Sequence, residues 1–259
     1  MVAALTVAVL AAAAVAAAAS ARYRESWSIS PSTAGTKDHP RPLTSLATAL
    51  DVTASPRGQR PDLTTDLDLS FAGVHQGSRW FPHCSRQRVL DQGQDACRRS
   101  LIGQGLVDSL VGLSGNPRSA TACRLALNLY DGPTNHLVLV VSGGPQTRVS
   151  GLGGRRSCPL TIPDLPMDAS WTNDARGSRL RVHVDDALQH PQQDVDNALV
   201  HAEWRLQAAP VRVLVQGRSR SRGIVESFAC PRSRRLQATA RFTTASGPTA
   251  TARAFALCR

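Results

Sequence analysis

The sequence predicts a mainly β protein with minor α structure. Residues 123–144 read CRLALNLYDGPTNHLVLVVSGG, where apolar residues alternate with other residues before a turn-forming DGPTN and the run HLVLVV follows it. Two strand-like runs around a turn predict an antiparallel hairpin. Short alternating runs recur after residue 178, and only residues 194–209 show apolar residues at helical spacing. We therefore expect the second half to be a small antiparallel β-sheet or sandwich that carries one helix.

The first 21 residues predict a cleaved signal peptide. They contain no charged side chain and end in Ala-Ser-Ala just before Arg22, which is the small-residue pattern of cleavage sites. An uncleaved anchor is the alternative, because the apolar run is nearly long enough to cross a bilayer and has no Lys or Arg before it. No later stretch has the length and hydropathy of a membrane span, so we expect the mature chain to have no direct membrane span.

Residues 22–70 predict an extended or partly disordered arm, because they are rich in Ser, Thr, Pro and Arg and show little periodicity. Trp27 stands out in this arm. A large aromatic side chain in a polar segment suits an anchor on a partner surface, and the alternative is that it packs onto its own domain. Residues 101–115 place leucines near helical spacing but contain four glycines, so a short helix or an irregular turn fits them.

Breaker residues suggest a domain boundary near residues 150–167, and alternating runs follow it. Each run is short, is rich in Val, Leu, Ala or Thr, and ends near a turn sequence. The predicted strands are residues 178–184, 211–215, 223–230, 236–244 and 249–258.

The chain has six cysteines, and the predicted secretion favours disulfides over catalytic thiols. Cys123 begins the hairpin, so we expect it to bond an earlier segment, which would stabilise the fold by about 3 kcal/mol. A metal site is the alternative, but no C-x-x-C pair occurs and the histidines are scattered. We expect neither a metal nor another cofactor.

Lys and Arg number 30 against 19 Asp and Glu, giving a formal net charge of +11. Lys37 is the only lysine, which suggests a GC-rich coding bias, yet residues 212–259 still hold ten Arg and one Glu. Such a segment suits acidic proteins or sulfated glycans, whereas nucleic acid is not expected outside the cell. Solvated turns are the alternative to a binding face. The candidate binding residues lie in two predicted turns and are Arg218, Arg220, Arg222, Arg232, Arg234 and Arg235.

A search for catalytic motifs finds none that is complete. GLSGN at residues 112–116 misplaces the second glycine of a nucleophile elbow, and neither a P-loop nor H-E-x-x-H occurs. Asp185 and Asp186 fit a solvated turn with a helix cap better than an acid-base pair, and His183 fits a strand surface. We therefore expect no enzyme, with a pocket assembled from distant residues as the alternative.

Five features occur together in a recognisable order. They are SWSIS near the mature N-terminus, a cysteine pair closing one loop, CRLALNLYDGPTNHLVLV, LRVHVDDA, and the final ARAFALC. In these features the chain resembles the cytomegalovirus envelope glycoprotein that joins two other small subunits on the gH/gL heterodimer. The five-subunit complex lets the virus enter cells. The resemblance covers about residues 97–259.

The resemblance implies a chemokine-like N-terminal domain, placed at residues 71–160, followed by a β-rich domain at residues 161–259. It implies a noncatalytic subunit of a viral envelope glycoprotein complex that acts in receptor engagement, cell tropism and penetration of the host cell. The partners would be gH/gL, two small envelope subunits, and a host cell-surface receptor or sulfated glycan. The protein would pass through the host secretory pathway to the virion surface as a peripheral subunit, or be secreted.

The resemblance also implies disulfides between Cys97 and Cys123 and between Cys230 and Cys258, which leaves Cys84 for Cys158. One of the last two could instead bond a neighbouring subunit. The alternative function is a secreted basic binding or inhibitor protein of a GC-rich bacterium, which the composition fits equally well. An extracellular enzyme is a third, weaker reading.

Overall fold

The computed structural model describes residues 21–54, 56–145 and 158–259. The predicted signal peptide lies outside these residues apart from Ala21. Residues 150–157 of the predicted boundary at 150–167 also lie outside them. The described chain is mainly antiparallel β-structure with little helix, as the sequence predicted.

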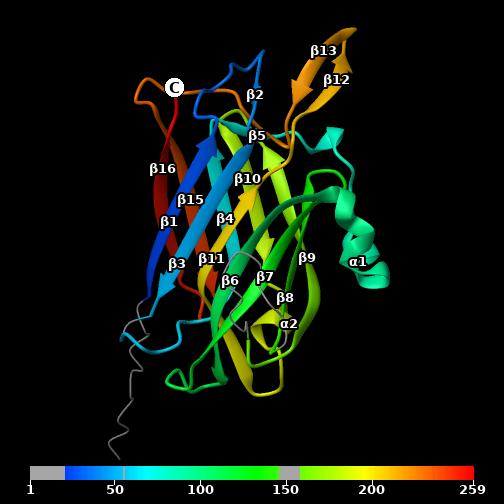
Figure 1. The fold of residues 1–259 in the computed structure, drawn as a ribbon. Helices are drawn as coiled ribbons and strands as arrows, with labels where there is room; N and C mark the ends of the chain where they lie inside the picture. Colours follow the sequence, from blue (N-terminus) through cyan, green and yellow to red (C-terminus); the bar gives the residue numbers. More distant parts are fainter. Residues whose placement is uncertain (1–20, 55, 146–157) are drawn as a thin grey trace, which may run out of the picture.

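Eleven strands form one sheet, and they come from the whole described chain (Figure 1). In spatial order they are β1 (Arg22–Ser30), β3 (Ser45–Thr53), β11 (Val195–Leu206), β6 (Leu101–Leu113), β7 (Thr121–Asp131), β8 (His136–Gly143), β9 (Ile162–Asn173), β10 (Gly177–His183), β4 (Thr64–Ala72), β15 (Arg235–Thr244) and β16 (Thr249–Leu257).

The sheet rolls up until its two edges meet. Every neighbouring pair is antiparallel, and the order contains eleven strands. Because eleven is odd, the edge strands β1 and β16 must run in the same direction. They lie side by side on one flank of the molecule (Figure 1), so the roll closes along a parallel seam.

Alternation along each strand places apolar side chains inside the roll. The largest fully buried side chains include Trp171 and Phe242. β15 and β16 present mainly alanines inward, and this leaves room for the larger residues of β1. The ring centroids of Tyr23 and Phe242 lie 4.7 Å apart, and those of Trp27 and Phe71 lie 5.5 Å apart.

A second, smaller core lies outside the roll. It forms where α1 (Arg86–Gln92) and η2 (Gln94–Ser100) pack with outward-facing residues of β7 and β8, among them Val138 and Val140. This packing explains why the LVLVV of β8 is apolar on both faces. The short η1 (Ser78–Trp80) precedes α1 in the chain. α2 (Asp186–Gln189) lies toward the lower end of the roll in Figure 1.

Two small sheets sit at the upper end of the roll in Figure 1. One consists of β2 (Arg41–Pro42), β14 (Val225–Ser227) and β5 (Val74–Gln76). The other is the hairpin of β12 (Val211–Val215) and β13 (Arg218–Arg222), which projects from the body.

Four expectations about secondary structure are wrong. Residues 218–222 were expected in a turn, but they form β13, which pairs with β12. Residues 22–70 are not an extended or disordered arm, because they supply β1, β3 and β4. Residues 194–209 form β11 instead of a helix, because a bulge between Leu199 and His201 changes the strand period and imitates helical spacing. Residues 101–115 form β6, whose glycines let β11 approach closely.

The expected division into two domains differs from the structure as well. β11, from the predicted β-rich domain, lies between β3 and β6, and β9 pairs with β8. Strands from residues 71–160 and 161–259 therefore share one sheet and one interior core.

Candidate anion-binding site at the arginine-rich end

The β12–β13 hairpin gathers three arginines on one face. Gln216 and Gly217 have φ values of 50° and 74°, which suit a two-residue hairpin turn and so fix the strand register. In that register the arginines of β13 lie opposite the valines of β12, and directly opposed residues share a face. The pairs are Val211 with Arg222, Val213 with Arg220, and Val215 with Arg218.

A hollow of about 620 Å³ lies between β13 and residues 34–42. Arg218, Arg220, Arg222 and Arg41 border it, so its rim is strongly cationic. Arg220 Nη1 donates to the backbone oxygen of Asp38 at 3.3 Å, which ties the hairpin to the opposite wall.

A second hollow of about 520 Å³ shares Pro40 and Arg222 with the first. Lys37, Arg79 and His75 line it. The ring centroids of His75 and Phe228 lie 3.9 Å apart. Asp38 and Glu226 line the second hollow as well, but cationic side chains outnumber them across the two hollows. The two hollows therefore form one predominantly cationic region that runs across residues 37–42. We call this region the arginine-rich end.

Glu226 holds Arg222 in place between the two hollows. Glu226 is 2 % exposed, and its carboxylate accepts from Arg222 Nη2 at 2.8 Å and from Gly223 N at 3.1 Å. Burial raises the pKa of Glu226, while the Gly223 N–H and the nearby Arg222 and Arg79 charges oppose that rise. Arg222 is thus a positioned, largely buried residue, and the expectation of an exposed turn residue was wrong for it.

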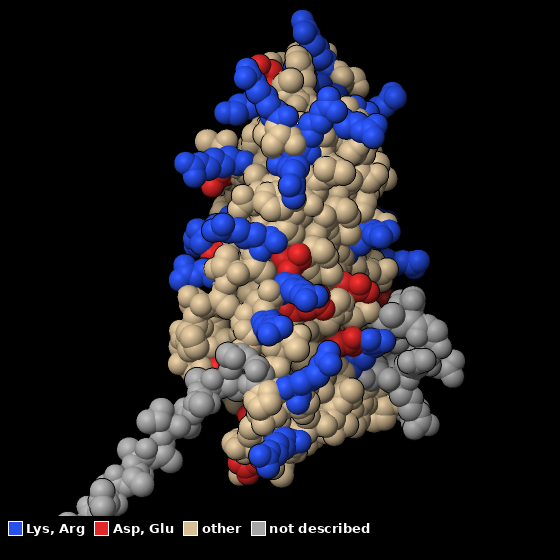
Figure 2. All heavy atoms as spheres, turned by 90° about the vertical axis from the view of Figure 1, so that its left-hand side faces the viewer, with Lys and Arg blue, Asp and Glu red and all other residues tan. Residues whose placement is uncertain are grey.

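Figure 2 shows that Lys and Arg gather at this upper end with few Asp and Glu among them. In the second predicted run, Arg232 and Arg234 are exposed in the turn before β15, and Arg235 is exposed at the first position of β15. This run borders neither hollow, and Arg235 lies over the Phe255 ring at 4.4 Å. The two runs therefore occupy one end of the roll but do not share a hollow.

Trp27 was expected to be a candidate partner anchor, and this was wrong. It is 6 % exposed and points into the roll beside Phe71. The reason is the alternation of β1, in which the polar neighbours of Trp27 face outward. The composition of the segment is therefore polar although one face of the strand is buried. The alternative, packing onto its own domain, is what the structure shows.

The disulfides join Cys84 to Cys97, Cys123 to Cys158 and Cys230 to Cys258. The Cys230–Cys258 pairing is confirmed, whereas Cys97–Cys123 and Cys84–Cys158 are wrong. Cys97 belongs to the small core outside the sheet, while Cys123 faces the interior of the roll. The hairpin is therefore bonded to a later segment, not to the earlier one that we expected.

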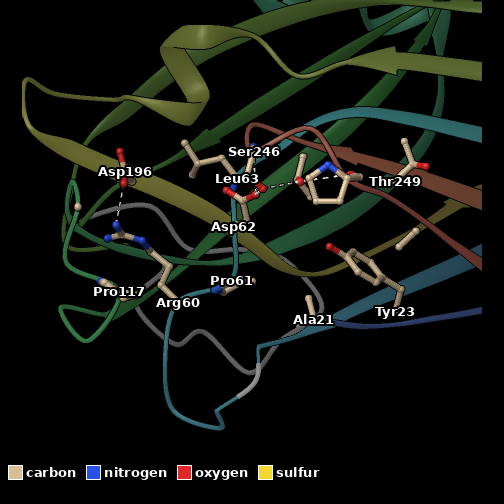
Figure 3. Close-up of a pocket in the computed structure, with 14 residues that line it drawn as sticks. Ala21, Tyr23, Arg60, Pro61, Asp62, Leu63, Pro117, Asp196, Ser246 and Thr249 are labelled. Atoms are coloured by element: carbon tan, nitrogen blue, oxygen red, sulfur yellow. Dashed lines mark hydrogen bonds and ion pairs between the residues drawn. The ribbon is translucent and has the colours of Figure 1, made fainter. Parts of the chain in front are cut away.

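The opposite end of the roll has a hollow of about 570 Å³ (Figure 3). Arg60, 5 % exposed, pairs with Asp196 at 2.7 Å and donates to the backbone oxygen of Leu113 at 3.0 Å. Ser246 donates to Asp62 through its backbone N–H at 3.2 Å and through its hydroxyl. Because these polar groups are engaged with one another, they act as ties between loops.

Sequence reasoning missed two buried carboxyl groups. Burial raises the pKa of Glu25 to about 7 and that of Asp131 to about 8. Asp131 is fully buried beneath the segment before α1, and His83 Nδ1 lies 3.0 Å from its Oδ2. Glu25 would have been found if β1 had been recognised, because it alternates in phase with Tyr23 and Trp27.

The remaining candidates have structural contacts. Asp185 caps α2 by accepting from Ala187 N at 3.0 Å, and it also pairs with Arg86 at 3.2 Å. His183 Nδ1 lies 2.9 Å from an oxygen of Asp66 on the outer surface. Within residues 21–54, 56–145 and 158–259, no three His, Cys, Asp or Glu side chains group as metal ligands would. In the same ranges, no helix has both the length and the hydropathy needed to cross a membrane.

Comparisons with protein-family models, with curated proteins and with solved structures find no match to this chain. The functional argument therefore depends on the site itself.

Proposed function

We propose that this protein is a noncatalytic binding protein of the secretory pathway or cell exterior, and that its arginine-rich end binds a sulfated glycan chain. The observation that carries the proposal is the shared cationic rim of the two hollows, formed by segments far apart in the sequence. Disulfide bonds between all six cysteines support an oxidising compartment.

The geometry suits an extended anion better than a compact one. The hollows lie on either side of residues 37–42 and share Pro40 and Arg222, so a chain can contact both. Planar guanidinium groups bind sulfate through paired hydrogen bonds. Arg222 is preorganised by Glu226, while Arg218 remains exposed on the rim.

The test is retention on immobilised heparin. The double variant R218S/R220S should elute at clearly lower salt than the parent, because it lacks two of the arginines that hold the sulfates. Salt weakens the remaining exposed charge interactions, which are screened beyond a Debye length of about 8 Å at physiological ionic strength. Stability should change by less than about 0.5 kcal/mol. Arg222 is left intact because removing it would leave Glu226 buried without its ion pair.

The matched control is R241S/R253S, which removes the same charge from exposed positions on the outer face of β15 and β16. Equal loss of retention in both double variants would mean that net charge alone determines binding. That outcome would contradict a site at the arginine-rich end.

We further propose, on the sequence resemblance, that this binding serves a viral envelope complex with gH/gL and two small subunits. The Cys230–Cys258 bond fits that resemblance, while the other two bonds and the single sheet depart from it. Coexpression with gH, gL and the small subunits should yield a complex that survives gel filtration. A protein that remains monomeric there would favour the alternative of a secreted bacterial binding or inhibitor protein.

A further inference from the structure

An apolar cavity lies inside the rolled sheet, on the side that α2 covers. Its volume is about 80 Å³, and its walls come from strands β4 and β6 to β11 together with Leu188 of α2. Thr64, Ser109 and Asn197 are the polar residues among the described side chains that line it, and no charged one does.

Two of these polar residues present an atom without a partner. Asn197 is 7 % exposed, and its Nδ2 donates to the backbone oxygen of Leu188 at 2.9 Å. Its Oδ1 has no hydrogen-bond partner among the described residues, and the same is true of Oγ1 of Thr64, which is 4 % exposed. Ser109, by contrast, donates to the backbone oxygen of Cys123 at 3.4 Å.

Unpaired polar atoms are costly in an apolar interior and are normally satisfied. Sites for small molecules combine an apolar lining with a few convergent polar groups. The cavity has this composition. A single water would have the minimum of the two to four polar partners that a buried water makes, because two wall atoms are unpaired. The rest of the wall is mostly apolar, which suits a ligand with an apolar body better than water.

We propose that this cavity binds one small neutral molecule that has an apolar body and a hydroxyl group, in the size range of a short-chain aliphatic alcohol. The hydroxyl donates to Asn197 Oδ1, and the apolar body contacts the Leu and Val side chains of the wall. The ligand is neutral because a charge would find no counter-charge on this wall. It is smaller than benzene, because a cavity of about 150 Å³ is what accommodates benzene.

Met167 provides a built-in reporter of occupancy. It is 5 % exposed and lines the cavity. The sequence has two methionines, and the other, Met1, lies in the predicted signal peptide. In protein labelled with ¹³C-methyl methionine, the signal that disappears in M167L is therefore assigned to the cavity wall.

The test is a titration of the labelled protein with 1-propanol, followed through the Met167 methyl signal. We expect a saturable shift and nuclear Overhauser effects from the propyl protons. Ethyl methyl ether is an isomer of 1-propanol that cannot donate a hydrogen bond. It should bind about tenfold more weakly, because Asn197 Oδ1 then stays unpaired.

Filling the cavity should abolish the response. A202L adds three carbons to the wall, while the matched control A122L adds them at an exposed position of β7 and should leave binding unchanged. If A202L does not fold, V141L makes a smaller addition from β8. Equal binding of alcohol and ether, a non-saturating response, or unchanged binding in the folded filling variant would overturn the proposal. None of these results bears on heparin retention.

Discussion

Glu25 shows how a single buried carboxyl group links the interior of the roll to solution pH. Burial raises its pKa from the usual 4.5 to about 7, and the nearby Ala240 backbone N–H offsets only part of that rise. Between these two values the folded chain binds more protons than the unfolded chain. The free energy of unfolding therefore falls as pH rises through this window, and the lost stability is not regained above it.

We predict that E25Q, which cannot ionise, resists urea more than the parent at pH 8 and about equally at pH 4.5. The comparison isolates Glu25, because the titration of Asp131 is common to both proteins. Urea denaturation at pH 4.5, 6 and 8 measures the difference, and E203Q, at a half-exposed side chain, is the control. A stability difference that stays constant across the three pH values would contradict the assignment.

At the scale of single elements, the contact of β6 with β11 depends on glycine. Gly105 pairs with Trp204, and a Cβ placed at Gly105 would overlap the backbone oxygen of Glu203. G105A should therefore destabilise the protein by about 1–3 kcal/mol through overpacking. G115A adds the same methyl group into open space at a φ of 73° and should cost only about 1 kcal/mol. Urea midpoints compare the two, and an equal loss would refute close packing as the cause.

Most of the strands that the sequence located correctly have unbroken alternation. The first strand of the pair at residues 123–144 and the strands at 236–244 and 249–258 keep a period of two. β8 does not, and it was located because its apolar run follows a turn sequence. β11 was mistaken for a helix because its bulge adds one residue between successive inward-facing side chains, which imitates helical spacing. β1 was mistaken for a loop because its outward residues are polar and its strand partner was unknown.

The candidate site was predictable only where it is local in sequence. The alternation of Arg and Ser in residues 218–222 placed three arginines together. Lys37, Arg41 and Arg79 could not be assigned to the same region, because β2, β14 and β5 meet only through long-range pairing. The pairing of Cys123 was missed for the same reason: its alternation with the leucines of β7 gives the face that it occupies, but not which distant cysteine meets it there.

For the whole molecule, the Cys230–Cys258 bond fixes the end of β16 beside the seam. Its removal in C230A/C258A frees a loop of 28 residues and should cost about 3–4 kcal/mol. Amide hydrogen exchange should accelerate in β16 more than in β7. The control C84A/C97A opens a 13-residue loop outside the roll and should leave exchange in β16 unchanged. Uniform acceleration in both variants would argue against a local role for the bond.

The parallel seam also has a consequence for the order of folding. It joins the first and the last strands of the described chain, so the roll cannot close until β16 has emerged. Until then the sheet carries two open edges, and open edges invite pairing with other chains. Contacts of such long sequence separation make folding slow. The nascent protein would therefore depend on chaperones that shield strand edges for as long as β16 is still being made.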